Sequence, residues 1–364
     1  MNIQTAVALA LMHGVMRNRL LGAVRDLTPA HDNGEGWLSL VWERLQVETL
    51  SDGAVFQVLF DDARARAGEV LAATTEIGAS ILAFGSESYP ALLAAIHDPP
   101  AALWLRGDAT ALGEPAVAIV GSRAASHYAR EAASRLAFDL ARRGLVIVSG
   151  MARGVDGAAH EGALEGGGRT VAVLGSGVDV PYPAEHSTLL ERIASAGAVV
   201  SEFPPGTGPL PHHFPMRNRI ISGLSRAVVV IEAGEKSGSL ITARCALEQG
   251  REVMAVPGNA LSGLNRGAHA LLKDGAKLVE GADDILEELR TLPMASTGVA
   301  DCKLLVHNGL ILDLQPGETY ALDDLVAMVG LSASELLPRL LELELEGRLT
   351  RLPGGRFAAA GKRV

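Results

Sequence analysis

Residues 201–244 read SEFPPGTGPLPHHFPMRNRIISGLSRAVVVIEAGEKSGSLITAR, and this stretch decides the fold. Its prolines exclude regular structure from the first part, and Pro215 suits the first turn of a helix that continues through MRNRIISGL. The run AVVVI at 227–231 is short, apolar and β-branched, which is typical of a strand buried on both faces of a parallel sheet. The small residues SGS at 237–239 then precede a second helical pattern, LITARCALEQG.

The same stretch indicates a phosphate ligand. Arg217 and Arg219 flank Asn218 on the first predicted helix, and guanidinium groups form forked hydrogen bonds with phosphate. A helix that starts at SGS directs unpaired backbone N–H groups outward, with serine hydroxyls beside them, and this arrangement favours an anion. We therefore predict that phosphate is the ligand of this stretch.

Strand and helix patterns alternate over the whole of residues 116–289. The apolar runs VAIVG, LVIVSG, TVAVLG, AVVSEF, RAVVVIEA, EVMAVPG and AKLVE are separated by helical patterns of ordinary length. This alternation predicts an α/β fold with a doubly wound, Rossmann-like, mostly parallel sheet. Ligands of such sheets bind outside the carboxyl ends of the strands, where the strand order reverses, and the Gly-rich segments of this chain follow strands.

The segments on either side of the sheet predict two further domains. We expect a helical domain (SAM or helix-hairpin-helix-like) over residues 1–88, the Rossmann-like domain over 89–291, a linker over 292–302 and a winged helix-turn-helix domain over 303–364.

The second helix predicted for the last domain carries Glu335, Glu342, Glu344 and Glu346 against one basic residue, Arg339. Because phosphates dominate DNA affinity, this acidic helix favours protein contact or packing over base readout. In the first domain, Trp37 and Trp42 are predicted core residues.

Composition limits the kinds of partner. The chain has 364 residues, and 48% of them are hydrophobic, which supports a sizeable core. No apolar run approaches the roughly 20 residues needed to cross a bilayer, and the first residues lack a basic leader region, so we expect an initial helix, a cytoplasmic protein and no membrane partner. Cys245 and Cys302 have neither metal-ligand spacing nor a disulfide pattern, so no metal is expected.

Charge and aromatic content indicate a compact nucleic-acid site, if one exists. The net charge is −10, but residues 111–290 carry 18 basic and 20 acidic side chains and are nearly balanced. A broad basic surface of the usual DNA-binding kind is therefore not expected. Aromatic residues make up 4% of the chain, so a DNA strand would be held by its phosphates, with Phe214 as the candidate base contact.

Two more glycine segments follow predicted strands. GSR at 121–123 lacks the G-x-G-x-x-G pattern of dinucleotide folds, but its Ser and Arg can bind a phosphate; the alternative is a strand-end arginine in a surface ion pair. GSG at 175–177 precedes VDVPYP, and both a nucleotide loop and an ordinary rigid connection fit it.

Asp156 and His160 in SGMARGVDGAAH lie four residues apart, hence on one helix face. They could form an acid–base pair, or Asp156 could cap the helix while His160 makes a buried polar contact. The second interpretation is favoured, because no nucleophile or third partner follows at a useful spacing.

Six blocks in order resemble the DNA-processing protein A family (DprA, also called Smf): GSR, SGMARGVDGAAH, LGSGVDVPYP, FPMRNRIISGLS, EAGEKSGSLITA and VPGN followed by GAHALLKDGAKLV. The resemblance runs from about Tyr89 to Leu289, and the flanking domains fit it. It implies a homodimer that binds single-stranded DNA, protects incoming DNA and loads the RecA recombinase during natural transformation, with no cofactor. The winged helix would serve other protein partners.

The resemblance also implies that GSR, the FPMRNR helix and the SGS helix start contact the DNA backbone. Two positions differ from relatives: Ala184 stands where many relatives have a basic residue, and Pro211 stands where some do. Arg153, Lys236 or the histidines at 212–213 are candidates to compensate for these missing cations. The predicted DNA-binding residues are Gly121, Ser122, Arg123, Arg153, Gly175, Ser176, Gly177, Phe214, Arg217, Asn218, Arg219, Lys236, Ser237, Gly238, Ser239 and Thr242.

An apolar stripe within residues 263–278 is either a dimer face or an ordinary core face. Its members are Leu264, Ala268, Leu271 and Leu272.

The competing function is a nucleotide phosphoribohydrolase. The Rossmann-like pattern also resembles the lysine-decarboxylase-like phosphoribohydrolases, whose PGGxGTxxE block supplies a catalytic glutamate. In this chain Ala243, Arg244 and Cys245 follow Thr242, and no carboxylate occurs before Glu248. Without that acid the hydrolase lacks its chemistry, so we predict a protein that is not an enzyme.

Overall fold

The structure is a computed structural model of the 364-residue chain, and it divides into two compact units, Met1–Leu292 and Pro293–Val364. The residues that it describes are 2–11, 53–291, 303–307, 310–314, 321–322, 325–326, 331, 333–345, 349–352 and 356–359. Trp37 and Trp42, two predicted core residues, lie outside these ranges.

A nine-stranded sheet forms the centre of the first unit, in the order β1-β2-β6-β5-β4-β3-β7-β8-β9. The strands from β6 to β9 in this order are mutually parallel, whereas β2 pairs antiparallel with both β1 and β6. The strands are β1 (Ser80–Ala83), β2 (Ala102–Gly107), β3 (Ala116–Val120), β4 (Val146–Ser149), β5 (Thr170–Leu174), β6 (Ala198–Ser201), β7 (Ala227–Val230), β8 (Glu252–Ala255) and β9 (Lys277–Leu278). The prediction of a Rossmann-like, mostly parallel sheet is confirmed.

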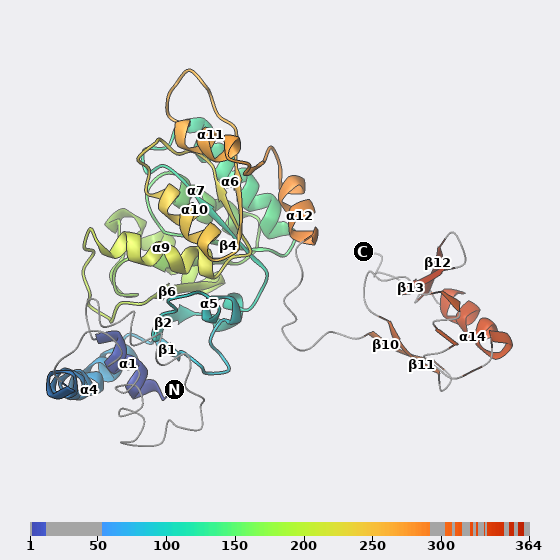
Figure 1. Ribbon diagram of the computed structural model, residues 1–364, viewed down its shortest axis with the longest axis horizontal. Helices are drawn as coiled ribbons and strands as arrows, with labels where there is room; N and C mark the ends of the chain where they lie inside the picture. The colour runs from blue at the N-terminus through green and yellow to red at the C-terminus, as the bar shows by residue number, and fades with distance from the viewer. Residues whose placement is uncertain are drawn as a thin grey trace. The chain divides into compact units, whose positions relative to one another are not determined.

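Helices cover both faces of this sheet. In Figure 1, α9 and α10 lie side by side in front of the strands, and the two helices are in contact. The described helices of the unit are α1 (Ile3–Leu11), α4 (Gly53–Glu76), α5 (Ala91–Ala94), α6 (His127–Arg142), α7 (Val155–Glu165), α8 (Ser187–Ala196), α9 (His213–Gly223), α10 (Ser239–Glu248), α11 (Arg266–Lys273) and α12 (Ala282–Thr291), with short 3₁₀ turns η2 (Ala109–Leu112) and η3 (Ala184–His186).

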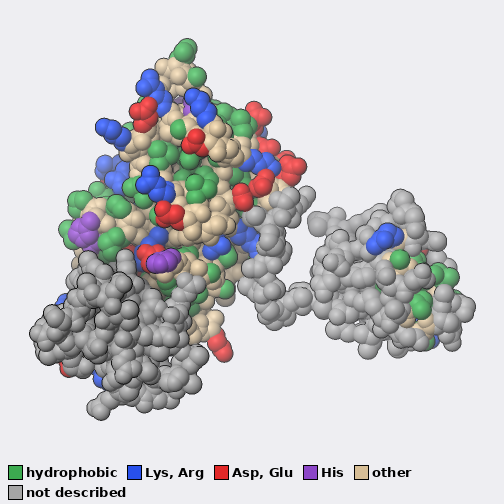
Figure 2. Space-filling view, in the orientation of Figure 1, with side chains coloured by type: hydrophobic (Ala, Val, Ile, Leu, Met, Phe, Trp, Pro, Cys, Tyr) green, Lys and Arg blue, Asp and Glu red, His purple; other side chains and the backbone are tan. Residues whose placement is uncertain are grey.

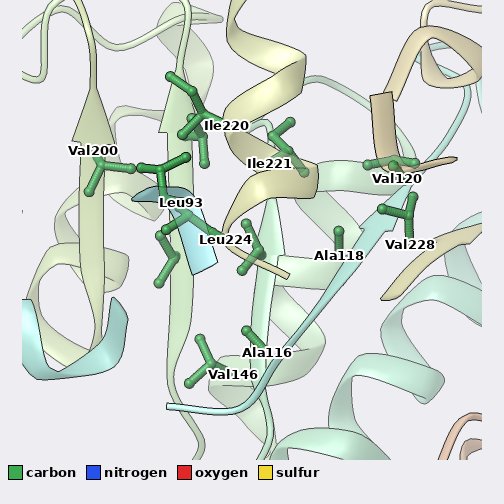
Figure 3. Close-up of a cluster of buried hydrophobic side chains, with 14 of the residues drawn as sticks. Leu93, Ala116, Ala118, Val120, Val146, Val200, Ile220, Ile221, Leu224 and Val228 are labelled. Atoms are coloured by element: carbon green, nitrogen blue, oxygen red, sulfur yellow. The ribbon is translucent and has the colours of Figure 1, made fainter. Parts of the chain in front are cut away.

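Alternation along β3 explains why the strands are apolar at every position. Ala118 and Val120 belong to one hydrophobic layer, which includes Ile220 and Ile221 of α9, while Ile119 belongs to the opposite layer with α6 and α7. Figure 3 shows part of the first layer, with side chains from α9 gathered among those of the strands. Because successive strand residues point to opposite faces, a strand covered on both faces needs no polar position.

The sheet begins earlier in the chain than the predicted domain boundary. β1 starts at Ser80, before Tyr89, and pairs with β2 over Ser80–Ala83. The sequence predicted only helix in this region, because a four-residue strand is too short for its period to be recognised. The predicted domain boundaries themselves stay predictions.

The second unit contains a β-hairpin and a helix followed by another hairpin. β10 (Lys303–His307) pairs with β11 (Leu310–Leu314), and after α14 (Ala333–Leu345) β12 (Leu349–Leu352) pairs with β13 (Arg356–Ala359), all antiparallel. Leu336, Leu340 and Leu343 of α14 are buried against Leu349 and Phe357. The helix followed by two paired strands is the predicted winged part, whereas the pairing of β10 with β11 was not predicted.

Candidate functional site

A pocket of about 760 Å³ opens at the carboxyl ends of β3 and β7. These two strands are neighbours although the chain visits three other strands between them, so the strand order reverses here. We call this cavity the switch-point pocket, and its place is the one at which doubly wound sheets bind ligands. Its lining brings together the predicted residues Gly121, Ser122, Arg123, Phe214, Arg217, Asn218, Lys236, Ser237, Gly238, Ser239 and Thr242.

Arg123 lies at the exposed end of the loop that follows β3. Its guanidinium carbon is 5.0 Å from the centre of the Phe214 ring, which places the cation over an aromatic face. Gly121 is required two residues earlier, because a Cβ there would lie 2.6 Å from a methyl carbon of Val155. The loop therefore packs against α7 and presents Arg123 to the pocket.

Arg217 lies on α9 with only 3% of its surface exposed. One of its Nη atoms donates to the carbonyl oxygen of Val173, and its Nε has no hydrogen-bond partner among the residues that the structure describes. Burial lowers the pKa of Arg217 to about 10, and the nearby Asp156 carboxylate opposes this shift. The guanidinium stays charged at neutral pH. The pocket lining therefore contains a buried cation whose Nε–H group makes no hydrogen bond to a described residue.

Asp156 is the carboxylate of the pocket lining, and the sequence interpretation gave it no place there. Its Oδ2 accepts a hydrogen bond from the backbone N–H of Ala152, which holds the loop before α7. Burial raises the pKa of Asp156, while Arg217 acts in the opposite direction. The spacing of Asp156 and His160 along the chain could not reveal that Asp156 lies near Arg217, because Arg217 comes from another element, α9.

His160 makes the buried polar contact that was predicted. Its Nδ1 lies 2.7 Å from Thr170 Oγ1, and the Thr170 hydroxyl in turn donates to the carbonyl oxygen of Ile147. Burial is the main reason that the pKa of His160 falls to about 3. An imidazole held neutral inside the sheet layer does not act with Asp156 as an acid–base pair.

The SGS segment forms the start of α10 as predicted. Gly238 is the residue before the helix, its carbonyl accepts a hydrogen bond from Asn218 Nδ2 at 3.2 Å, and the hydroxyls of Ser237 and Ser239 are 2.7 Å apart. A Cβ added at Gly238 would meet no atom within 4 Å, so the space in front of this helix start is open. Asn218 therefore positions the helix start, and the N-terminal dipole of α10 faces the pocket.

Arg219 does not fit the predicted phosphate contact. It belongs to α9 like Arg217, but both oxygens of the buried Glu202 carboxylate accept hydrogen bonds from it, at 2.8 and 3.0 Å, and Asp98 lies 2.8 Å from its Nε. It is absent from the lining of the switch-point pocket. Two carboxylates already occupy its guanidinium, so its contribution is to the packing of α9.

The GSG segment also lies outside the pocket lining. A Cβ at Gly175 would lie 3.0 Å from the Phe214 ring, and the hydroxyl of Ser176 donates to the carbonyl oxygen of Val180. A Cβ at Gly177 would lie 2.8 Å from the carbonyl oxygen of Pro204. These contacts support the rigid-connection interpretation, in which the segment forms the backing for Phe214.

An aromatic residue of the next loop was missed. Tyr182 lines the pocket and its ring centre lies 5.3 Å from that of Phe214, with 42% of the residue exposed. Its position between two prolines in PYP, at the end of a strand-end loop, was the available signal. The pair provides an apolar wall beside the cationic groups.

The predicted apolar stripe at residues 263–278 is mostly core. Ala268 is fully buried, and Leu271 and Leu272 pack against the same hydrophobic layer. Leu264 is 48% exposed and remains available for a dimer contact.

Charges are mixed on the surface of this unit. Figure 2 shows basic and acidic side chains interspersed on the visible face of the described residues. A search of the described residues finds no helix long and apolar enough to span a membrane, and no group of three metal-binding side chains.

Comparison with known proteins identifies both parts of the chain. Residues 80–290 match the model of the DNA recombination-mediator protein A family, and residues 311–355 match the DprA winged helix domain. Protein Smf of Escherichia coli is 43% identical over 281 residues, covering 74% of this chain and 75% of that protein. DNA processing protein DprA of Bacillus subtilis is 46% identical over 221 residues, covering 60% and 74%.

Two solved structures agree with these matches. DNA processing protein A from Streptococcus pneumoniae aligns with a TM-score of 0.67 and 34% identity, covering 79% of this chain and 98% of that one. The protein from Helicobacter pylori, whose structure concerns its unique single-stranded DNA binding mode, aligns with a TM-score of 0.53 and 32% identity over 58% of this chain and 95% of its own. The chain therefore belongs to the DNA recombination-mediator protein A family, whose members include the DprA and Smf proteins.

Proposed function

We propose that this protein binds single-stranded DNA in the switch-point pocket, mainly through the phosphate backbone. The observation that carries this proposal is the convergence of three groups on one cavity: Arg123, the buried Arg217 and the open start of α10. Guanidinium groups and helix N-termini are the two protein features best suited to phosphate oxygens. The single-stranded DNA binding described for the Helicobacter pylori relative supports the same ligand class.

In this mechanism each group has a separate task. Arg217 supplies a fixed positive charge in a place of low solvent access, where charge–charge attraction is stronger than in water. Arg123 closes on a phosphate from the exposed side, steadied by the ring of Phe214. The Phe214–Tyr182 wall offers a surface for a base or sugar without reading its identity.

At the level of the cell, we infer that the protein protects incoming DNA and loads RecA recombinase during natural transformation, as a homodimer. Membership of the recombination-mediator family supports this inference. To test this inference, the rate of RecA filament growth is measured on oligo-dT that is coated with a separate single-strand-binding protein, with and without the protein described here. An unchanged rate would contradict the loading role.

The hydrolase alternative has less support. In α10, the residues after Thr242 are Ala243, Arg244 and Cys245, and Glu248 is the last residue of the helix. Asp156, the carboxylate of the pocket lining, is already held by the N–H of Ala152. We therefore infer a binding protein and not an enzyme; release of free base from nucleoside monophosphates would contradict this.

A salt titration of binding to oligo-dT tests the DNA proposal directly. We expect tighter binding to oligo-dT than to duplex of matched length, and a loss of about 1.5–3 kcal/mol in Arg123→Ala, the range for hydrogen bonds to charged groups. Arg143→Ala is the matched control, because Arg143 is also exposed but pairs with Asp283 away from the pocket. Tighter duplex binding, or equal losses in the two variants, would contradict the proposal.

A further inference from the structure

A second cavity, of about 90 Å³, continues from the switch-point pocket past Phe214. We call it the rim pocket. It shares Arg123, Ala152, Tyr182, Phe214 and Arg217 with the larger cavity, so a strand that enters one can extend into the other. The residues that only the rim pocket adds are Gly150, Arg153 and Pro183.

Arg153 is the cation that the rim pocket adds to those of the switch-point pocket. Its side chain is 64% exposed, and it forms a forked ion pair with Glu185, whose Oε2 lies 2.9 Å from Nη2 while Oε1 accepts from Nε. Glu185 is itself 52% exposed and lies on η3, directly after the Tyr182-Pro183 segment. Exposed pairs of this kind contribute little to folding, so Arg153 can change partner at small cost.

The carboxylate of Glu185 makes the contact that a DNA phosphate would make. A carboxylate and a phosphate both accept two parallel hydrogen bonds from a guanidinium fork. Hydrogen bonds from Arg153 lower the pKa of Glu185 to about 2, so Glu185 keeps its negative charge at neutral pH. A phosphate entering the rim pocket must displace this carboxylate and then remain beside its negative charge.

We propose that Glu185 is an affinity-limiting residue of the DNA site, because it occupies the guanidinium fork of Arg153 in place of a DNA phosphate. This inference rests on the proposed binding of single-stranded DNA. Through Glu185, the protein holds single strands less tightly than its set of arginines would allow, and a DNA strand can be released more readily.

Neutralising Glu185 separates this role from a structural one. Binding of fluorescein-labelled oligo-dT is measured for Glu185→Gln over a range of salt concentrations. We expect about 1.5- to 5-fold tighter binding, which corresponds to the loss of one exposed ion pair. We also expect a slope of log affinity against log salt that is steeper by about 0.7, because Arg153 then neutralises one more phosphate.

Glu191→Gln is the matched control. It removes the same charge from another pair, in which the exposed Glu191 lies 2.9 Å from the partly buried Arg106, and neither residue lines either pocket. We expect Glu191→Gln to leave the affinity and the salt slope unchanged. An equal gain in both variants would mean that only net charge matters, and it would overturn the inference.

Glu185→Gln in an Arg153→Ala background tests whether Arg153 is the group that Glu185 occupies. There the gain from Glu185→Gln should disappear, because no guanidinium remains to be released. A gain that persists, or weaker binding by Glu185→Gln alone, would overturn the role of Glu185 while leaving single-strand binding intact. Failure of the wild-type protein to bind oligo-dT would instead contradict the proposed function itself, and with it this inference.

Discussion

The two sides of helix α9 use the same residue type for opposite purposes. Arg217 and Arg219 are two positions apart, hence about 200° apart around the helix axis, and both are buried. Arg219 lies between Glu202 and Asp98, which complete its hydrogen bonding inside the protein. Arg217 lines the pocket, and its Nε has no hydrogen-bond partner in the described part of the chain.

This contrast shows what separates a structural from a ligand-binding arginine. Burial alone does not, since 3% of Arg217 and 8% of Arg219 are exposed. The difference lies in the partners, because the guanidinium that meets two carboxylates has no charge left for a ligand.

The largest effect is expected for Arg219→Met. This change leaves the Glu202 carboxylate buried without its ion pair, and the removal of one partner of such a pair typically costs about 3–5 kcal/mol of unfolding free energy. Urea denaturation measures the loss. The salt slope of DNA binding, taken where the variant is folded, should equal that of the wild type, and a flatter slope would mean that Arg219 contacts DNA.

The same substitution on the other side, Arg217→Met, should act mainly on binding. We expect a loss of about 1.5–3 kcal/mol in affinity for oligo-dT, since hydrogen bonds to a charged group disappear. The salt slope should flatten by about 0.7, because one phosphate contact fewer is made in a single strand. An affinity within twofold of the wild type would remove the distinction between the two arginines.

A smaller effect is expected from Gly238→Val at the start of α10. A valine fits the folded protein, because the space at Gly238 is open and its backbone φ is −61°. It would keep a phosphate from the helix start, with a loss of about 0.3–1 kcal/mol and no change in the salt slope. Gly281→Val is the matched control, because Gly281 also precedes a helix, α12, has open space for a Cβ and no positive φ, and does not line the pocket. It should bind oligo-dT like the wild type.

The smallest effect on binding is expected when residues 293–364 are removed. The groups that we propose to bind phosphate all belong to the unit Met1–Leu292. The truncated protein should keep most of its affinity for oligo-dT in the same titration, once circular dichroism shows that it is folded. A nearly complete loss of binding by a folded truncation would place the DNA site in the winged helix.

Much of the site was predictable because it follows strand ends. GSR comes directly after β3 and SGS follows β7, and the carboxyl ends of parallel strands meet at one sheet edge whatever the details of packing. The strand order itself was not predicted, and it is the order β4-β3-β7 that brings these two segments into contact with one cavity.

The predicted site residues that the structure places outside the pocket lining have contacts that depend on distant residues. Arg219 was predicted to bind phosphate because it stands beside Arg217, but its partner Asp98 comes from a loop 121 residues earlier. GSG at 175–177 was predicted to bind DNA because it follows a strand, but its glycines are needed where Phe214 and Pro204 approach. Contacts between segments that are distant in the sequence leave no pattern in the local sequence of either segment.

The sequence by itself determined the alternation of strands and helices, the apolar strands covered on both faces, and the residue types suited to phosphate. Those properties follow from local periodicity and from the chemistry of single side chains. Only the tertiary structure decided which cations are available, since an arginine already held by Glu202 or Glu185 differs from Arg217 in partners that come from other segments of the chain. The electrostatic field at a guanidinium is set by every charge within a few ångströms, and folding alone brings those charges together.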